Sequence, residues 1–116
     1  KAALDELFSL KQHTIHCVVI EDVHALPKDG PVQAFTFGYG LGLIHMACQV
    51  YDLSVVNVPP TVWKAKYGLT SDKDKSRAMA SRFFPHNTGM WSKKKDDGRA
   101  EAALLGLLGF TEGWGR

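Results

Sequence analysis

The stretch TIHCVVIED, residues 14–22, decides how this chain folds. Its first seven residues are almost uniformly apolar and rich in β-branched side chains, which predicts a strand over 14–20 that is buried on both faces. The strand stops abruptly at two acids, Glu21 and Asp22. Ligand crevices in open α/β sheets form at the carboxyl ends of such strands. Glu21 is therefore either a functional carboxylate or an ordinary solvated acid, and its position alone supports both interpretations equally.

A strand–helix–strand unit follows from the segments downstream. Residues 35–51 form a long apolar stretch whose length favours a buried helix, and residues 53–58 predict a second strand that ends at two prolines. Two strands joined in this way run parallel in one sheet. Further helices are expected over 4–13, over 71–84 with Ser71 as N-cap, and, after a loop over 86–95, from Asp96 or Asp97 to Gly109. The last helix has an apolar stripe that consists of Ala100, Ala103, Leu104, Leu107 and Leu108. The expected class is α/β, with two parallel strands and four helices.

The expected sheet is incomplete, because a parallel ribbon of two strands leaves both of its edges open. The first strand has the composition of a sheet centre, so the sequence predicts further strands, or the same strand of a second chain, beside residues 14–20. The chain starts at Lys1 rather than Met, so either a tag was removed or upstream sequence is missing. Gly38, Gly40 and Gly42 interrupt the apolar helix and predict that another backbone packs closely against them.

Composition limits the class of protein. A chain of 116 residues is the size of one domain, and 45% hydrophobic with 22% charged residues excludes disordered and low-complexity classes. No apolar run approaches the ~18 residues that span a bilayer, and no signal peptide opens the chain. The two cysteines, Cys17 and Cys48, are too few for a disulfide scaffold. We therefore expect a cytoplasmic domain without membrane contact.

Charge differs between the two halves of the chain. Residues 1–60 carry three Lys and Arg against six Asp and Glu, a net charge of −3. Residues 61–116 carry eleven against six, a net charge of +5. A basic half suggests a polyanionic partner, although an ordinary solvated surface explains the asymmetry too.

Paired acids mark the start of the last predicted helix, in KKKDDGRAEA, residues 93–102. Asp97 and Glu101 are four residues apart and share one helix face, where like charges disfavour the helix unless a cation binds between them. Oxygen-rich sites of this kind suit Mg²⁺ or Mn²⁺. In the alternative interpretation, Asp96 and Asp97 serve the helix N-terminus, and Glu101 is a surface residue paired with Arg99 or a lysine.

Basic residues alternate with aromatic ones in PPTVWKAKYGL, residues 59–69, and the basic pattern continues over residues 71–77. Such a segment could contact phosphates. Equally, Trp63 could pack beneath the sheet while the lysines are solvated.

Together these segments resemble the RuvC-like Holliday junction resolvases, particularly their phage and prophage branch. That family has an RNase H-like fold. The resemblance covers about residues 4–110, and the Ile-Glu strand end and the final acidic motif are specific only in combination. The matching stretches are VVIEDVHA (18–25), FTFG (35–38) with Gly42, VPPTVWK (58–64), DKDKS (72–76) through Pro85, and KDDGRAEAA (95–103).

The resemblance implies a homodimer that cuts four-way DNA junctions by two-metal phosphodiester hydrolysis, with Mg²⁺ as cofactor and Mn²⁺ as a substitute. It assigns Glu21, Asp97 and Glu101 as catalytic metal ligands. The residues it assigns to DNA contact are Lys64, Lys66, Lys73 and Lys75, and we add the basic residues of the acidic motif, Lys93, Lys94, Lys95 and Arg99.

One feature of the family is missing. The family begins with a strand that carries an Asp-x-Gly motif and the first metal ligand, and neither predicted strand of these 116 residues carries one. Asp5, on a predicted amphipathic helix, is a poor substitute. We therefore expect residues 1–116 to be one RNase H-like domain, truncated at its N-terminus and completed by dimerisation. Its activity is in doubt, and the alternatives are a catalytically impaired module that binds branched DNA and a repurposed dimeric module.

Overall fold

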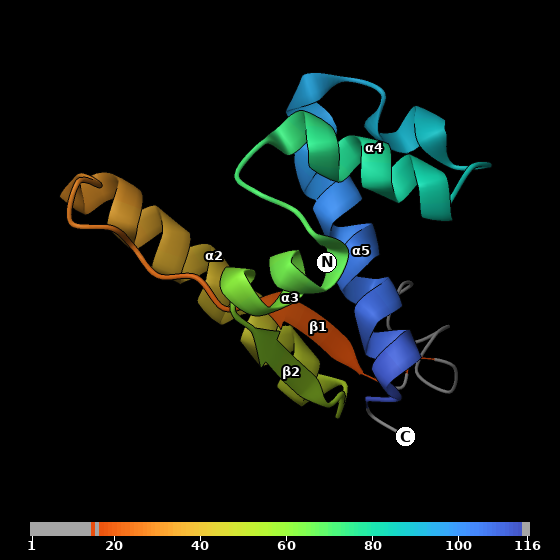
Figure 1. The fold of residues 1–116 in the computed structure, drawn as a ribbon. Helices are drawn as coiled ribbons and strands as arrows, with labels where there is room; N and C mark the ends of the chain where they lie inside the picture. Colours follow the sequence, from red (N-terminus) through yellow and green to blue (C-terminus); the bar gives the residue numbers. More distant parts are fainter. Residues whose placement is uncertain (1–14, 16, 115–116) are drawn as a thin grey trace.

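The computed structural model describes Ile15 and residues 17–114 (Figure 1). The predicted helix over 4–13, with Asp5, lies outside these residues. Within them the chain is α/β with two parallel strands, as expected, and it has four α-helices, three of which were predicted. The elements are β1 (Val18–Glu21), α2 (Pro31–Val50), β2 (Val55–Val58), α3 (Pro60–Tyr67), α4 (Lys73–Phe83), the 3₁₀ helices η1 (Thr88–Trp91) and η2 (Lys94–Asp96), and α5 (Asp97–Glu112).

The two strands pair in parallel, so the predicted strand–helix–strand unit is confirmed. Val18 lies beside Val55 and Glu21 beside Val58, and the Asp22 amide donates to the Val58 carbonyl at 2.8 Å. Because side chains alternate along a strand, Glu21 shares a face with Val19 and Val58. Glu21 is thus the last residue of β1 rather than the first residue after it, and its side chain faces the core.

Helix α5 closes that face of the sheet. A Cβ built at Gly109 would lie 2.7 Å from Cγ2 of Val19, so only glycine allows α5 to approach β1 this closely. The prediction that Gly109 ends the helix is therefore wrong: α5 continues to Glu112 and stops at Gly113, which adopts a left-handed φ of 73°. The prediction of a strand buried on both faces is also wrong, since every residue of β1 is only half-buried.

The core lies among α3, α4, α5 and the two strands. Trp63 and Leu104 are fully buried at its centre, and the predicted apolar stripe of α5 is confirmed by the burial of Ala100, Leu104 and Leu108. Helix α3 was not predicted, because it starts at a pair of prolines and three of its first seven residues are polar or charged, which resembles a loop. Proline suits the first position of a helix, and the buried indole of Trp63 gives this short helix its tertiary anchor.

Helix α4 begins one residue later than predicted. Asp72, not Ser71, is the N-cap: its backbone is extended, and its side chain accepts a hydrogen bond from the Asp74 amide at 2.9 Å. Both residue types cap helices well, so sequence preference alone does not separate them.

Helix α2 stands apart from the core. Its N-terminal half extends away from α3, α4 and α5 (Figure 1), and Cys48 is its only buried residue among those the structure describes. Burial raises the pKa of the Cys48 thiol. No described atom lies within 4 Å of a Cβ built at Gly38, Gly40 or Gly42, so the predicted close backbone contact is absent from this part of the chain. None of the helices described here is both long and apolar enough to cross a membrane.

Replacing Gly109 tests the α5–β1 contact. Gly109→Ala should lower the free energy of unfolding by about 1–3 kcal/mol, because the new methyl group overlaps Val19. The matched control is Gly106→Ala on the same helix, where no described atom lies within 4 Å and alanine should stabilise by up to about 1 kcal/mol. Urea unfolding measures both, and equal stabilisation by the two variants would contradict the close approach.

Candidate functional site

The strand-end acid has a specific partner. Nε1 of Trp63, in α3, donates a hydrogen bond to Oε2 of Glu21 at 2.6 Å. The indole is fully buried, so its N–H needs an acceptor inside the protein, and a carboxylate makes a strong one. Glu21 is therefore held in place by the core rather than freely solvated, and one of its two oxygens remains for another partner.

The acidic pair of α5 converges on a lysine of α4. Lys73 Nζ lies 3.1 Å from both carboxylate oxygens of Glu101 and 3.9 Å from Oδ2 of Asp97. Ser76, fully buried, also donates its hydroxyl to Oε2 of Glu101 at 3.3 Å. The Glu101 side chain is 12% exposed, so it is not an ordinary surface residue. The alternative that pairs Glu101 with a lysine is supported, and the lysine is Lys73.

The neighbouring residues of the motif behave differently. Asp96 stands at the N-cap of α5 but makes no capping hydrogen bond with its side chain, while Asp97 lies in the first turn. Arg99 is 4.0 Å from Oδ1 of Asp96 and donates to the Met90 carbonyl at 3.4 Å. Acidic side chains at a helix N-terminus interact favourably with the helix dipole. The alternative interpretation, in which Asp96 and Asp97 serve the N-terminus of α5, is therefore supported as well.

Asp97 and Glu101 offer carboxylate oxygens, which are the ligand atoms that Mg²⁺ prefers. Both carboxylates already contact one cation, the ammonium group of Lys73. Among the described residues, however, no three His, Cys, Asp or Glu side chains lie close enough together to hold a metal ion. Glu21 is fixed on Trp63 and is not gathered with Asp97 and Glu101 in such a group. The assignment of all three to one metal centre stays a prediction.

The predicted DNA-binding residues fall into two sets. Some already contact a partner: Lys66 pairs with Glu112 at 3.1 Å, and Lys64 Nζ lies 5.7 Å from the ring centre of Trp63. Lys73 and Arg99 pair with acids as described above. The other set is exposed to solvent and consists of Lys75, Lys93, Lys94 and Lys95.

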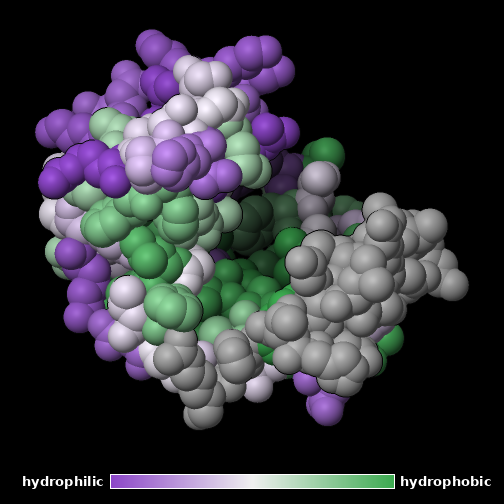
Figure 2. All heavy atoms as spheres, turned by 90° about the vertical axis from the view of Figure 1, so that its right-hand side faces the viewer, coloured by the Kyte–Doolittle hydropathy of each residue, from purple (hydrophilic) through white to green (hydrophobic). Residues whose placement is uncertain are grey.

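Figure 2 shows hydrophilic side chains gathered over the upper part of the molecule, at the height where α4 and the 3₁₀ helices lie in Figure 1, with an apolar hollow below them. The exposed set of lysines belongs to α4 and to the segment around η2. These four lysines are therefore concentrated at one end of the molecule.

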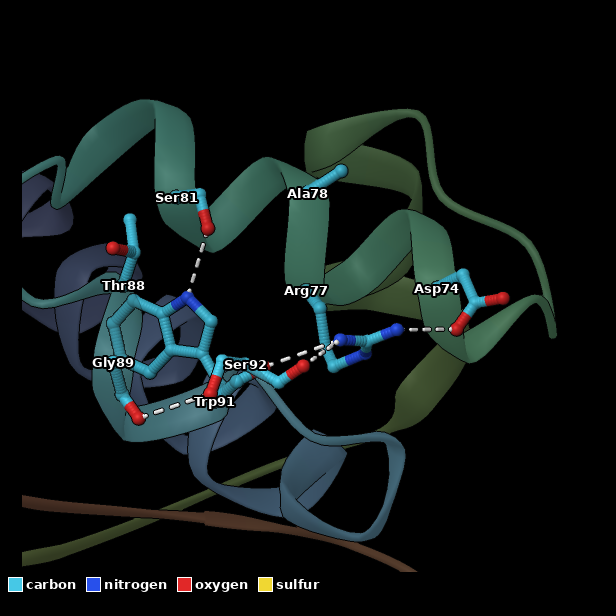
Figure 3. Close-up of a pocket in the computed structure, with 8 residues that line it drawn as sticks. All are labelled: Asp74, Arg77, Ala78, Ser81, Thr88, Gly89, Trp91 and Ser92. Carbon is cyan, nitrogen blue, oxygen red and sulfur yellow. Dashed lines mark hydrogen bonds and ion pairs between the residues drawn. The ribbon is translucent and has the colours of Figure 1, made fainter.

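A pocket of about 330 Å³ lies between α4 and η1 (Figure 3). Arg77 donates to the Trp91 and Ser92 carbonyls at 3.3 and 2.9 Å, and to Oδ1 of Asp74 at 2.7 Å. Trp91 in turn donates to Oγ of Ser81 at 3.0 Å. These bonds fix the segment that leads into Lys93–Lys95 against α4, so the exposed lysines project from an anchored backbone.

The Asp74–Arg77 pair persists at neutral pH. The hydrogen bond from Arg77, with help from the nearby Lys94, lowers the pKa of Asp74 below its usual range. Because the pKa of Asp74 is lower in the folded chain than in the unfolded chain, this pair stabilises the fold at any pH above the unfolded-state pKa of Asp74. The stabilisation is lost as pH falls through the folded-state pKa. The sequence placed Arg77 in the basic segment 71–77 without revealing its anchoring role, and it predicted a loop over residues 86–95. Trp91, a large apolar residue in an otherwise polar segment, was the available signal of an anchor.

Comparison with known proteins finds a relative that is named as a Holliday junction resolvase. No protein-family model matches the chain. Over 82 residues the chain is 33% identical to the chloroplastic Holliday junction resolvase MOC1 of Chlamydomonas reinhardtii, a match that covers 69% of this chain. The match spans only 9% of the length of that relative. The expected similarity to a Holliday junction resolvase is thus confirmed at this level, and the RuvC-like and phage assignments stay predictions.

Two substitutions separate the roles of Trp63 and Glu21. Trp63→Phe removes the indole N–H and leaves the half-buried Glu21 carboxylate without this hydrogen bond. We therefore expect the free energy of unfolding to fall by about 1–3 kcal/mol. Glu21→Gln keeps an oxygen that can accept the bond and should cost about 1 kcal/mol or less. Urea unfolding measures both changes. A Trp63→Phe variant as stable as the unmodified chain would refute the bond as a structural link.

Proposed function

We propose that this chain is part of a RuvC-like Holliday junction resolvase with an RNase H-like core, related to the phage and prophage branch and acting in the cytoplasm. In this proposal it binds four-way DNA junctions and contributes to phosphodiester hydrolysis. The observation that carries the proposal is the 33% identity to a Holliday junction resolvase over 82 residues. The match spans a small part of that relative, so the activity, substrate and partners of the whole relative come to this chain only as a proposal.

The acidic residues would provide the hydrolytic part of the site. Asp97 and Glu101, with Glu21, would hold Mg²⁺ or Mn²⁺, which when bound supplies charge neutralisation and water activation for phosphodiester hydrolysis. Trp63 keeps the Glu21 side chain in one orientation through the 2.6 Å bond. Ser76 does the same for Glu101 from the opposite helix. A carboxylate that is oriented before the substrate arrives loses less entropy in the reaction.

The basic residues would provide the DNA surface. Lys75, Lys93, Lys94 and Lys95 are exposed and lie on α4 and the anchored segment beside it, where they can approach phosphates without breaking an existing ion pair. Lysine contacts to phosphates give affinity and position but little sequence discrimination. The proposed preference for a junction over a linear duplex therefore depends on the shape of the DNA.

A second candidate is a module that binds branched DNA without cutting it. One observation favours it: Lys73 already pairs with the two acids of α5. A third candidate is a repurposed dimeric module that neither binds nor cuts DNA. Failure of the binding test below would support it.

Junction binding tests the proposal without depending on catalysis. Fluorescence anisotropy in a chelator should show tighter binding to a labelled four-way junction than to a linear duplex of equal length. Replacing Lys93, Lys94 and Lys95 with Gln should weaken binding to both and reduce the slope of log affinity against log salt by about 0.9 for each phosphate that the lysines no longer neutralise. Lys28→Gln, at an exposed lysine in the acidic half, is the control and should change nothing. Equal affinity for junction and duplex would overturn the proposal.

We further propose that a second copy of the chain covers α2, which would make the protein a homodimer. The residues Phe35, Tyr39, Leu43, Met46 and Val50 are all exposed and follow one another at intervals of three or four, which places them on one stripe of the helix. Helix α2 contains no charged residue. An uncharged helix about 30 Å long with an exposed apolar stripe suits a symmetric partner better than water.

Sedimentation velocity tests this dimer. The unmodified chain should sediment as a dimer at micromolar concentration, and Leu43→Glu should shift it to a monomer by placing a charge in the stripe. Gln33→Glu, exposed on the same helix outside the stripe, should remain dimeric. A monomeric unmodified chain would contradict the proposal, and a dimer that survives Leu43→Glu would move the interface to another surface, such as the strand edge expected from the sequence.

A further inference from the structure

Arg77, on α4, binds the backbone that leads into the exposed lysines. Its Nη1 donates to two successive carbonyls, those of Trp91 at 3.3 Å and Ser92 at 2.9 Å, and its Nη2 donates to Oδ1 of Asp74 at 2.7 Å (Figure 3). Lys93 follows directly in the sequence. The side chain of Arg77 is 19% exposed, so it acts on this segment from within the protein rather than from the solvent.

Two further contacts attach the same segment to the molecule. The indole of Trp91 is buried, donates to Oγ of Ser81 at 3.0 Å and meets the ring of Phe84 edge-on, with 6.2 Å between the ring centroids. Arg99, on α5, donates to the carbonyl of Met90 at 3.4 Å. Hydrogen bonds from two helices thus hold the three residues that immediately precede the lysines.

The geometry of arginine matters at position 77, and not only its charge. A planar guanidinium group presents several donors in a fixed fork and can bond two carbonyls and a carboxylate at once, whereas a lysine ammonium group is a compact charge on a flexible stem. Arg77 Nε is buried and makes no hydrogen bond to the residues that the structure describes. An unpaired buried donor destabilises a fold, so maximal stability is a poor explanation for this side chain.

A fixed backbone changes what the lysines can distinguish. Lysines on a flexible segment can move to the phosphates of DNA of any shape, and the segment loses conformational entropy when it binds. Lysines on a fixed backbone fit one arrangement of phosphates better than another, because phosphate contacts set the register and orientation of a protein on DNA. Rigidity of the segment therefore favours one DNA shape over the others.

We propose that Arg77 is a positioning residue that makes the surface formed by Lys93, Lys94 and Lys95 selective for branched DNA. Arg77 does not itself bind DNA in this proposal. It holds the three lysines in one arrangement, which suits the phosphates of a four-way junction better than those of a linear duplex. The inference rests on the proposed function, and it assigns the preference for a junction to a side chain that is largely shielded from solvent.

Other roles of Arg77 make different predictions. If Arg77 only stabilises the fold, a folded variant binds junction and duplex as well as the unmodified chain does. If Arg77 contributes its charge to DNA binding, Arg77→Lys keeps that charge and both affinities. If Arg77 positions the lysines, Arg77→Lys loses the fork, loosens the segment and weakens junction binding more than duplex binding.

The test measures the affinity of Arg77→Lys by fluorescence anisotropy in a chelator. We expect the affinity for a labelled four-way junction to fall at least about fivefold, the equivalent of ordering the backbone of one more residue on binding. The affinity for a linear duplex of equal length should fall less. Arg82→Lys, at an exposed arginine of the same helix, is the matched control and should leave both affinities unchanged.

A double-mutant cycle connects Arg77 to the lysines. In a chain that carries Lys93→Gln, Lys94→Gln and Lys95→Gln, adding Arg77→Lys should have no further effect on junction binding, because the residues that it positions are gone. An undiminished effect in that chain would mean that Arg77 acts elsewhere and would overturn the proposal.

Backbone order parameters from ¹⁵N relaxation test the anchor without DNA. Residues 92–95 should have values near about 0.85 in the unmodified chain and below about 0.6 in Arg77→Lys. Low values in the unmodified chain, or high values in both, would overturn the proposal. If Arg77→Lys does not fold, Ser92→Gly takes its place, since it loosens the same backbone and keeps the carbonyl that Arg77 binds, and it should lower the preference for the junction.

The binding results separate this inference from the proposed function. Unchanged affinities, or an equal loss for junction and duplex, overturn the positioning role and leave the proposed function standing. An unmodified chain that binds neither DNA overturns the proposed function, and the positioning role fails with it.

Discussion

The contact between α5 and β1 is the constraint on which the other features depend. Only glycine at position 109 lets the helix approach Val19 so closely, and that approach sets the position of α5 along the sheet. Because α5 is one continuous helix, fixing its C-terminal half also places its first turns beside α4. Tyr67 strengthens the arrangement by donating its hydroxyl to the Leu104 carbonyl at 2.7 Å. Burial raises the pKa of this hydroxyl, which keeps it protonated and able to donate.

The candidate site is thus built from acids that the core holds and bases that solvent reaches. Glu21 is tied to a buried indole, and Glu101 lies against a buried serine. Exposed lysines lie on α4 and on the segment that Arg77 anchors. Lys73 belongs to both sets, since it is half-exposed and contacts the acids.

The sequence predicted the parts of this structure that depend on local pattern. Apolar β-branched runs predicted both strands, and the apolar stripe of α5 predicted its buried face. It failed where tertiary contacts decide. Gly109 resembles a helix stop, and only the proximity of Val19 shows that it is a packing residue. The pairing of Lys73 with Glu101 joins residues 28 apart in the chain, and no spacing rule reveals it. The sequence left Trp63 either in a phosphate-contacting segment or packed beneath the sheet. It is buried in the core, and it also donates a hydrogen bond to Glu21 that the sequence did not indicate.

In the proposed function, DNA binds at the end of the molecule formed by α4 and residues 93–99. Chemical-shift mapping in ¹H–¹⁵N spectra of the full chain, with a four-way junction added in a chelator, tests this placement most directly. We expect amides of α4 and of residues 93–99 to shift, while those of α2 do not. Shifts confined to α2, or no shifts at saturating junction, would contradict it.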